Sequence, residues 1–461
     1  MWRFMLLWVF VTSVTAQQSA PVDDRKRVLA EVRQKVMLTL DRLPKYMCTE
    51  TIDRTTFQPK KKVTKRQFRP LGLDPKEPTP VRLVSCDEIA ALRKKADWQV
   101  LKDASDRLRL DVAVATDSEM FSWAGENRFN DRGLADLVRR GATSTGAFGS
   151  FLASIFGTDF ESNAANFTGK GEVNVEGRAL VAFDFRVPLE MSTFRMEDAA
   201  HNSAFVAYEG TFLVDPRTFD LVRLTVRASR IPPEFNVCEN VTTLDYGSVR
   251  LHDSEFLLPK DAVLHVTNAD GTELENRTVF SGCHEFLAES SVSFDTSSES
   301  AEGSQKIASK ILVLPAGLSF RIALTNAIDT ATAAAGDPIK AKLVSPIKGK
   351  GNGVLVPKGA AVTGRIVQME RLYLPGFESL TLALKLETVE ANGVQQPFNA
   401  KPESAVKRST GRGSVYRQGR PVGQMSDPED PGVGFLEFQD VSEHFVVNAG
   451  VEIAGTTAGG N

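Results

Sequence analysis

Apolar and polar residues alternate along most of the chain, and this period of two constrains the fold more than any other feature. Residues 106–129 show it most clearly, because every second position is apolar before a polar turn: Leu108, Leu110, Val112 and Val114, with the pattern resuming at Met120. Successive side chains of a strand point to opposite faces, so this alternation is typical of a half-buried hairpin. The sequence therefore predicts a mainly β protein.

Three further segments repeat the alternation: residues 177–190, 204–229 and 251–286. Turn residues separate their strands, with "DPRTFD" at 215–220 and Asp270–Gly271 in the last segment. We expect residues 24–295 to form one large twisted antiparallel sheet, shaped as a half-barrel with packed helices. The segment that opens this domain, 24–43, has Val28, Val32 and Val36 near helical spacing, which indicates an amphipathic helix on an apolar surface.

The sequence "GAFGSFLASIFG", residues 146–157, breaks the strand pattern. On a helix its large apolar residues fall on one face, opposite glycine and serine: Phe148, Phe151, Leu152, Ile155 and Phe156. Such a face can line or cover an apolar cavity under the sheet, and these five residues are our candidate ligand-binding set. The alternative, an ordinary core helix that fills the sheet, stays open.

The N-terminus has the pattern of a secretory signal peptide. A lone Arg3 precedes an apolar run at 4–11, and Ala16 is a small residue at the expected cut. We expect residues 1–16 to be this signal and the protein to be periplasmic or secreted, soluble after cleavage. A retained anchor helix is the alternative.

Four cysteines, an even number, favour two disulfides in an exported chain. We expect Cys48 with Cys86 and Cys238 with Cys283, because each pair lies in one contiguous block of strands and closes a moderate loop. Ser85 and Glu88 have capping-box spacing, so Cys86 would open a helix, where a reactive thiol is the alternative.

A second domain follows a polar segment. Residues 296–310 have a linker's composition, and 311–400 return to strand alternation as a small β-barrel domain. A polar, basic segment at 401–432 is predicted to be a disordered insert, and 433–461 to supply the terminal strands of the second domain.

Residues 311–400 resemble the start of the C-terminal β-barrel of the TrbI family, the channel subunits of type IV secretion and conjugation machines. The matching positions are Pro315, Ala316, Gly317, Leu324, Gly336, Val356, Pro357, Lys358, Gly359 and Gly364. Barrel subunits of that family assemble into rings. The resemblance therefore implies self-association, or an envelope protein partner, through the C-terminal barrel.

The glycine-rich run at 347–366 has a second interpretation, a phosphate-binding loop. That loop needs a lysine followed by serine or threonine and then a helix, whereas here Lys350 precedes Gly351 and an apolar strand. We expect one hairpin turn around Asn352 and a second at Pro357–Gly359.

A weaker similarity concerns the first domain. The hairpin that contains Gly210, Val214, Asp215, Pro216 and Thr218 is similar to the LolA-type half-barrel, which carries lipid or lipoprotein acyl chains. The resemblance implies a lipid or lipoprotein ligand. Residues 43–54 and 280–294 are also similar to exported acidobacterial proteins of unknown function.

Nothing in the sequence demands catalysis. The net charge, 55 minus 58 or −3, argues against nucleic-acid binding. Five histidines show no metal-binding spacing: His201, His252, His265, His284 and His444. His252 and His284 each precede an acidic residue, which strand alternation would turn to the opposite face.

We expect no catalytic residue, metal or cofactor, and an exported, non-enzymatic envelope protein that binds an apolar ligand or a protein partner. A channel component, or a hydrolase of envelope polymers, is the alternative.

Overall fold

The computed structural model describes residues 22–60, 65–66, 81–82, 85–115, 118–126, 129, 134–138, 141–157, 165–198, 202–285, 314–402, 405–406, 423–426 and 432–458. The expected signal peptide, 1–16, and the expected linker, 296–310, lie outside these residues. Of the helices in the described residues, none combines the length and the apolar character needed to cross a membrane.

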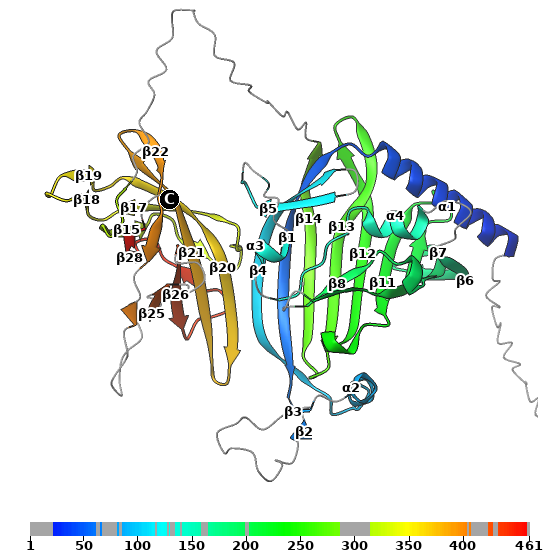
Figure 1. Cartoon of the computed structure of the whole chain (residues 1–461). Helices are drawn as coiled ribbons and strands as arrows, with labels where there is room; N and C mark the ends of the chain where they lie inside the picture. Colours follow the sequence, from blue (N-terminus) through cyan, green and yellow to red (C-terminus); the bar gives the residue numbers. More distant parts are fainter. Residues whose placement is uncertain are drawn as a thin grey trace, which may run out of the picture.

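An antiparallel sheet dominates the first half of the chain, which confirms that the protein is mainly β (Figure 1). Its strands are β1 (Tyr46–Pro59), β4 (Val100–Ala115), β5 (Ser118–Trp123), β6 (Asn166–Val175), β7 (Arg178–Val187), β10 (Ala207–Val214), β11 (Leu221–Ser229), β12 (Val237–Leu251), β13 (Ser254–Asn268) and β14 (Glu273–Glu285). Their order across the sheet is β6-β7-β10-β11-β12-β13-β14-β1-β4-β5. Most neighbours in space are neighbours in sequence, except that β1 lies between β14 and β4.

Helices, 3-10 turns and small strands complete this domain. The helices are α1 (Val22–Arg42), α2 (Cys86–Arg93), α3 (Leu134–Leu137) and α4 (Ser150–Phe156), with 3-10 turns η1 (Leu189–Met191) and η2 (Pro233–Phe235). The small strands are β2 (Lys65–Arg66), β3 (Val81–Arg82), β8 (Arg195–Glu197) and β9 (Ser203–Phe205). The predicted opening helix is confirmed, because Val28, Val32 and Val36 of α1 are buried in the core of the sheet domain.

The predicted disulfide pairing is wrong. Cys48 bonds Cys283 and Cys86 bonds Cys238. The prediction assumed that cysteines pair within a block of consecutive strands, but β1 pairs directly with the last strand, β14, and so brings Cys48 to Cys283.

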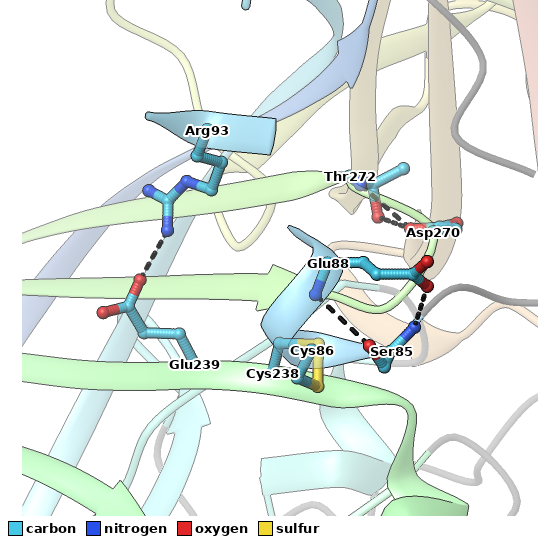
Figure 2. The surroundings of a disulfide bond; sticks show 8 residues. All are labelled: Ser85, Cys86, Glu88, Arg93, Cys238, Glu239, Asp270 and Thr272. Carbon is cyan, nitrogen blue, oxygen red and sulfur yellow. Dashed lines mark hydrogen bonds and ion pairs between the residues drawn. A yellow bond between two sulfur atoms is a disulfide. The ribbon is translucent and has the colours of Figure 1, made fainter. Parts of the chain in front are cut away.

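The second disulfide fastens α2 to β12 (Figure 2). The capping box is confirmed, since the Glu88 N–H donates to Ser85 Oγ and the Ser85 N–H to Glu88 Oε2. Arg93 at the other end of the helix pairs with Glu239, Nη1 to Oε2 2.7 Å. Cys86 is therefore a structural half-cystine and not a free reactive thiol.

A second antiparallel sheet lies in the C-terminal part, around its own core. Its elements are β15 (Ser319–Leu324), β16 (Ile328–Asp329), β17 (Pro338–Leu343), β18 (Ile347–Lys348), β19 (Val354–Val356), β20 (Ala361–Leu374), β21 (Phe377–Ala391), β22 (Val394–Pro397), β23 (Ala400–Pro402), β24 (Ala405–Val406), β25 (Gly423–Ser426), β26 (Val433–Gln439), β27 (Val446–Val447) and β28 (Glu452–Thr457). The main order is β23-β28-β15-β17-β20-β21-β26-β25-β24.

The two ends of this order, β23 and β24, are separated in the chain only by residues 403–404, which lie outside the description. The pairing of the described strands shows an antiparallel sheet and does not by itself show the closed barrel that the TrbI resemblance implied. The range 401–432, expected to be a disordered insert, contains the end of β23 together with β24 and β25, and its other residues except Gly432 lie outside the description.

The glycine-rich run forms the predicted hairpin. β18 pairs with β19, and Asn352 in the turn between them has a φ of 62°, in the left-handed region where asparagine and glycine are favoured. A turn also follows β19, where the Ala360 N–H donates to the Pro357 carbonyl oxygen at 3.3 Å. The run is thus two turns and a short ladder, without the helix that a phosphate loop requires.

The two sheets meet along β4 (Figure 1). One edge of β4 pairs with β1 throughout, while its other edge pairs with β5 at 110–115 and with β20 at 104–106. Between these two ladders Leu108 bridges Ala335 of the second domain. The guanidinium of Arg365 is buried at this junction, where Nη1 donates to the Ala124 carbonyl at 2.8 Å and Nε lies 3.6 Å from Glu126 Oε1.

Candidate ligand site on the inner face of the first sheet

One face of the first sheet, here called the inner face, is covered by α1 and α4. On β1, every second side chain is buried, and these side chains form the inner face: Tyr46, Cys48, Glu50, Ile52 and Arg54. α1 and α4 lie side by side near β6 at one end of the sheet (Figure 1). The domain's core lies between this face and the two helices.

A segment that we call the strap, residues 134–138 and 141–157, crosses the inner face. It contains α3 and α4. At its first end, Asn276 Nδ2 of β14 donates to the Ala142 carbonyl at 2.7 Å. Gly141 passes so near Arg54 that a Cβ there would lie 2.8 Å from Nη1, and its φ of 78° also favours glycine. Arg54 is held in turn by Asp106 of β4, with Nε 2.7 Å from Oδ1.

Glu119 of β5 holds the middle of the strap. Its carboxylate accepts from the backbone N–H of Gly146 at 2.7 Å and of Phe148 at 3.2 Å. Burial raises the pKa of Glu119, and these two hydrogen bonds oppose the rise. One side chain of the sheet thus supplies both acceptors for this turn of the strap.

The last part of the strap packs at the opposite end of the sheet. The Phe156 ring lies edge-on to Phe212 of β10, with centroids 5.2 Å apart, and stacks on Phe167 of β6 at 6.0 Å. Arg33 of α1 donates to the Phe156 carbonyl at 3.5 Å, and the Tyr208 hydroxyl donates to Ser154 Oγ at 2.9 Å. Few polar contacts therefore hold α4, whose remaining contacts are apolar.

The structure brings the five predicted ligand-site residues together on the strap. Phe148, Phe151, Leu152, Ile155 and Phe156 are between 1% and 6% exposed and belong to the core of the first domain. Four of them lie on α4 and face the sheet, as the helical spacing predicted, whereas Phe148 lies in the turn before the helix and packs on Tyr46.

Sequence reasoning missed the groups that hold the strap and those that lie beneath it. Glu119 was read only as part of a strand pattern, and Tyr46 and Glu50 not at all. The sequence contains a signal for Glu50. It alternates in register with Tyr46, Cys48 and Ile52, so on a strand its carboxylate lies on the same face as these apolar side chains. Burial first, then the nearby Glu119, raises the pKa of Glu50 to about 8.

The histidines form no site. The prediction that His252 and Asp253 face apart is wrong, because they lie in the β12–β13 turn, where Nε2 and Oδ2 are 3.0 Å apart. His284 lies near the end of β14 with Nδ1 2.8 Å from the Gly282 carbonyl oxygen, and His201 is outside the description. Within the described ranges, no group of three or more His, Cys, Asp or Glu side chains is arranged to hold a metal ion.

A cleft of about 480 Å³ lies at the junction of the two domains, lined by Arg109, Leu324, Asn326, Ala327, Ile328, Asp329, Thr332, Ala333, Asp337, Pro338, Ile339, Lys340 and Ile366. Arg109 forms an ion pair with Asp337 and also donates to the Thr332 carbonyl at 3.0 Å. The cleft thus contains one of the ion pairs that join the domains.

Comparison with known proteins gives only distant similarities. No protein-family model matches the chain. No curated protein matches it either. A LolA superfamily protein from Nitrosomonas europaea is similar with a TM-score of 0.25 and 6% identity, over 56% of this chain and 93% of that one. A DUF1329 family protein from Desulfovibrio piger has a TM-score of 0.24 and 7% identity, over 57% and 93%. We draw no functional conclusion from values this low.

Proposed function

We propose that this chain is an exported, non-enzymatic protein whose first domain, residues 24–295, binds an apolar ligand between the strap and the inner face of the sheet. The observation that carries the proposal is the strap itself. It presents five large apolar side chains to the sheet, four of them from a helix of 7 residues and Phe148 from the turn before that helix.

Such a short helix is not stable by itself, since isolated helices under about 12 residues are marginal in water. α4 also lies between two glycines, Gly149 and Gly157, which supply no side-chain cap to either end of the helix. The helix is therefore held by the sheet and by α1. An apolar chain of similar area can replace those contacts, so that the strap shifts outward while its aromatic face stays covered.

The two disulfides support export, because such bonds persist in oxidising compartments. A buried aromatic face that can exchange one apolar partner for another suits a carrier or a sensor of lipid-like molecules, and it needs no catalytic group.

Uptake of an apolar fluorescent probe by the purified full chain tests the proposal, together with mass spectrometry of lipids extracted from the protein as isolated. Leu152→Ala removes a buried side chain of α4 and should increase probe affinity several-fold, because the space it leaves is apolar. Met191→Ala is the matched control, since Met191 is 41% exposed in η1.

Saturable probe uptake that Leu152→Ala strengthens and Met191→Ala leaves unchanged supports the proposal. Absence of extracted lipid, together with no saturable uptake by either the parent chain or Leu152→Ala, would overturn it.

A further inference from the structure

Two tyrosine hydroxyl groups are buried under the strap without a partner. Neither Tyr46 Oη on β1 nor Tyr246 Oη on β12 has a hydrogen-bond partner among the described residues, and Tyr46 is 0% exposed. A buried polar atom without a partner is unfavourable, and native proteins contain few of them. Two on one face of one sheet therefore need a reason.

The two tyrosines lie in the same buried space, the core between the inner face and the strap. β12 and β1 are separated by β13 and β14, three inter-strand spacings or roughly 14 Å. Nevertheless Tyr246 acts electrostatically on Tyr46 and, after burial and Glu119, contributes to its raised pKa. Both side chains belong to the core that also contains the apolar residues of the strap.

Phe148 of the strap covers this space. Its ring lies edge-on to Tyr46, with centroids 5.9 Å apart, and edge-on to Phe280 of β14 at 4.8 Å. Phe280 is the β14 partner of Glu50 in the ladder. Movement of the strap at Phe148 thus uncovers Tyr46 and the neighbourhood of Glu50 at the same time.

The chemistry of this neighbourhood selects an uncharged group. The charge of Glu119 raises the pKa of both Tyr46 and Glu50. The nearby charge that affects this site is therefore that of a carboxylate. Glu50 itself, with a pKa of about 8, is mostly protonated at neutral pH and can donate a hydrogen bond. A buried anion would be repelled here, whereas a hydroxyl or amide can both donate and accept.

We propose that Tyr46, Tyr246 and Glu50 form the polar end of the ligand site and bind the uncharged hydroxyl or amide head of an amphiphile whose chain lies along the aromatic face of the strap. This inference rests on the proposed function and adds the class of ligand to it. The head supplies the partners that the two phenol groups lack, and the apolar chain takes the place of contacts made by Phe148 and α4.

The test compares four probes of equal chain length on the full chain at neutral pH: hexadecanol, hexadecanoate, hexadecylamine and hexadecane. Each is measured by displacement of a bound apolar fluorophore. We expect hexadecanol to bind at least about tenfold more tightly than each of the other three probes. This difference in affinity corresponds to one or two net hydrogen bonds.

The double variant Tyr46→Phe/Tyr246→Phe should lose this preference and bind hexadecanol about as weakly as hexadecane, with hexadecane affinity unchanged. Tyr373→Phe is the control, because Tyr373 lies on β20 and its hydroxyl is already 3.0 Å from Ser105 Oγ. The double variant should also unfold at the same or a higher temperature, since it removes two unpaired buried hydroxyls.

The outcomes separate the two proposals. If all four probes bind equally, or hexadecanoate or hexadecylamine binds best, the head-group inference is wrong and the proposed function stands. A double variant that keeps the hexadecanol preference, or that unfolds at a lower temperature because it has lost a bound water, also overturns it. If no probe displaces the fluorophore because none binds, the proposed function itself fails.

Discussion

The carboxylate of Glu119 accepts a hydrogen bond from the backbone N–H of Phe148, with the two atoms 3.2 Å apart. This contact joins β5 to the residue whose ring covers Tyr46. Because the same carboxylate also accepts from Gly146 at 2.7 Å, one side chain determines how closely the strap follows the sheet.

Glu119→Gln should loosen the strap while the sheet stays folded. An amide side chain offers one acceptor oxygen in place of two, so one of the two backbone N–H groups loses its partner, at about 1–3 kcal/mol. We expect the amides of Gly146 and Phe148 to exchange with deuterium at least about tenfold faster, measured on peptides that cover 141–157. Glu172→Gln on exposed β6 is the control, and equal exchange in both variants would contradict the assigned role.

Glu50 should make the protein less stable as pH rises from about 5 to 8. Its pKa is raised from 4.5 to about 8, so between these values the folded state holds a proton that the unfolded state has released. The free energy of unfolding therefore falls with pH in this window, by up to about 1.4 kcal/mol per pH unit for one proton.

Glu50→Gln should remove this slope. Glu119 and Glu126, whose pKa values burial also raises, contribute in the same direction in both proteins, so the difference between parent and variant reports Glu50 together with its interaction with Glu119. Urea unfolding at pH 5.5, 7 and 8.5 measures it, with Glu172→Gln as the control. A parallel pH dependence of parent and Glu50→Gln would show that Glu50 is not held protonated.

The bond between Cys86 and Cys238 should be the main attachment of α2. Its sequence separation is 152 residues, so its removal by Cys86→Ser/Cys238→Ser is expected to lower the free energy of unfolding by about 2–5 kcal/mol. The Arg93–Glu239 pair, which stays, is partly exposed and offsets little of this loss. Non-reducing peptide mapping checks the pairing, and a peptide that links Cys48 to Cys86 would contradict the structure.

Arg365 should couple the unfolding of the two domains. It is 6% exposed and lies near Glu126 of the first domain and Glu387 of the second. Arg365→Ala leaves both carboxylates without this cation, which is expected to lower the free energy of unfolding by about 3–5 kcal/mol.

We also expect Arg365→Ala to separate one urea transition into two. Arg321→Ala is matched, because Arg321 is 58% exposed and lies 3.7 Å from Glu452 on the surface, so its change should stay within about 1 kcal/mol. A single, unshifted transition for Arg365→Ala would count against the coupling.

Local pattern predicted local structure well. Alternation identified the strands around Leu110, helical spacing identified α1, and the Ser85–Glu88 pair identified the start of α2. Each of these depends on residues a few positions apart. The apolar face of α4 was found for the same reason.

Long-range pairing was beyond the sequence pattern. Nothing around Cys48 indicates that β1 will lie next to β14, so the disulfides were paired wrongly. Glu119 was missed because its partners, the N–H groups of Gly146 and Phe148, are backbone atoms that leave no trace in residue types. Tyr46 and Tyr246 belong to strands far apart in the sequence, and only the strand order of the folded sheet places both in one core.

The position of β1 between β4 and β14 has a consequence for the order in which the chain folds. A chain that enters the folding compartment from its N-terminus delivers Cys86 and Cys238 before Cys283, the native partner of Cys48. Throughout that interval β1 has one open edge, which can pair wrongly or aggregate. The native Cys86–Cys238 bond can form before β14 arrives, whereas a bond made early by Cys48 must be reopened by thiol–disulfide exchange before Cys48 can pair with Cys283.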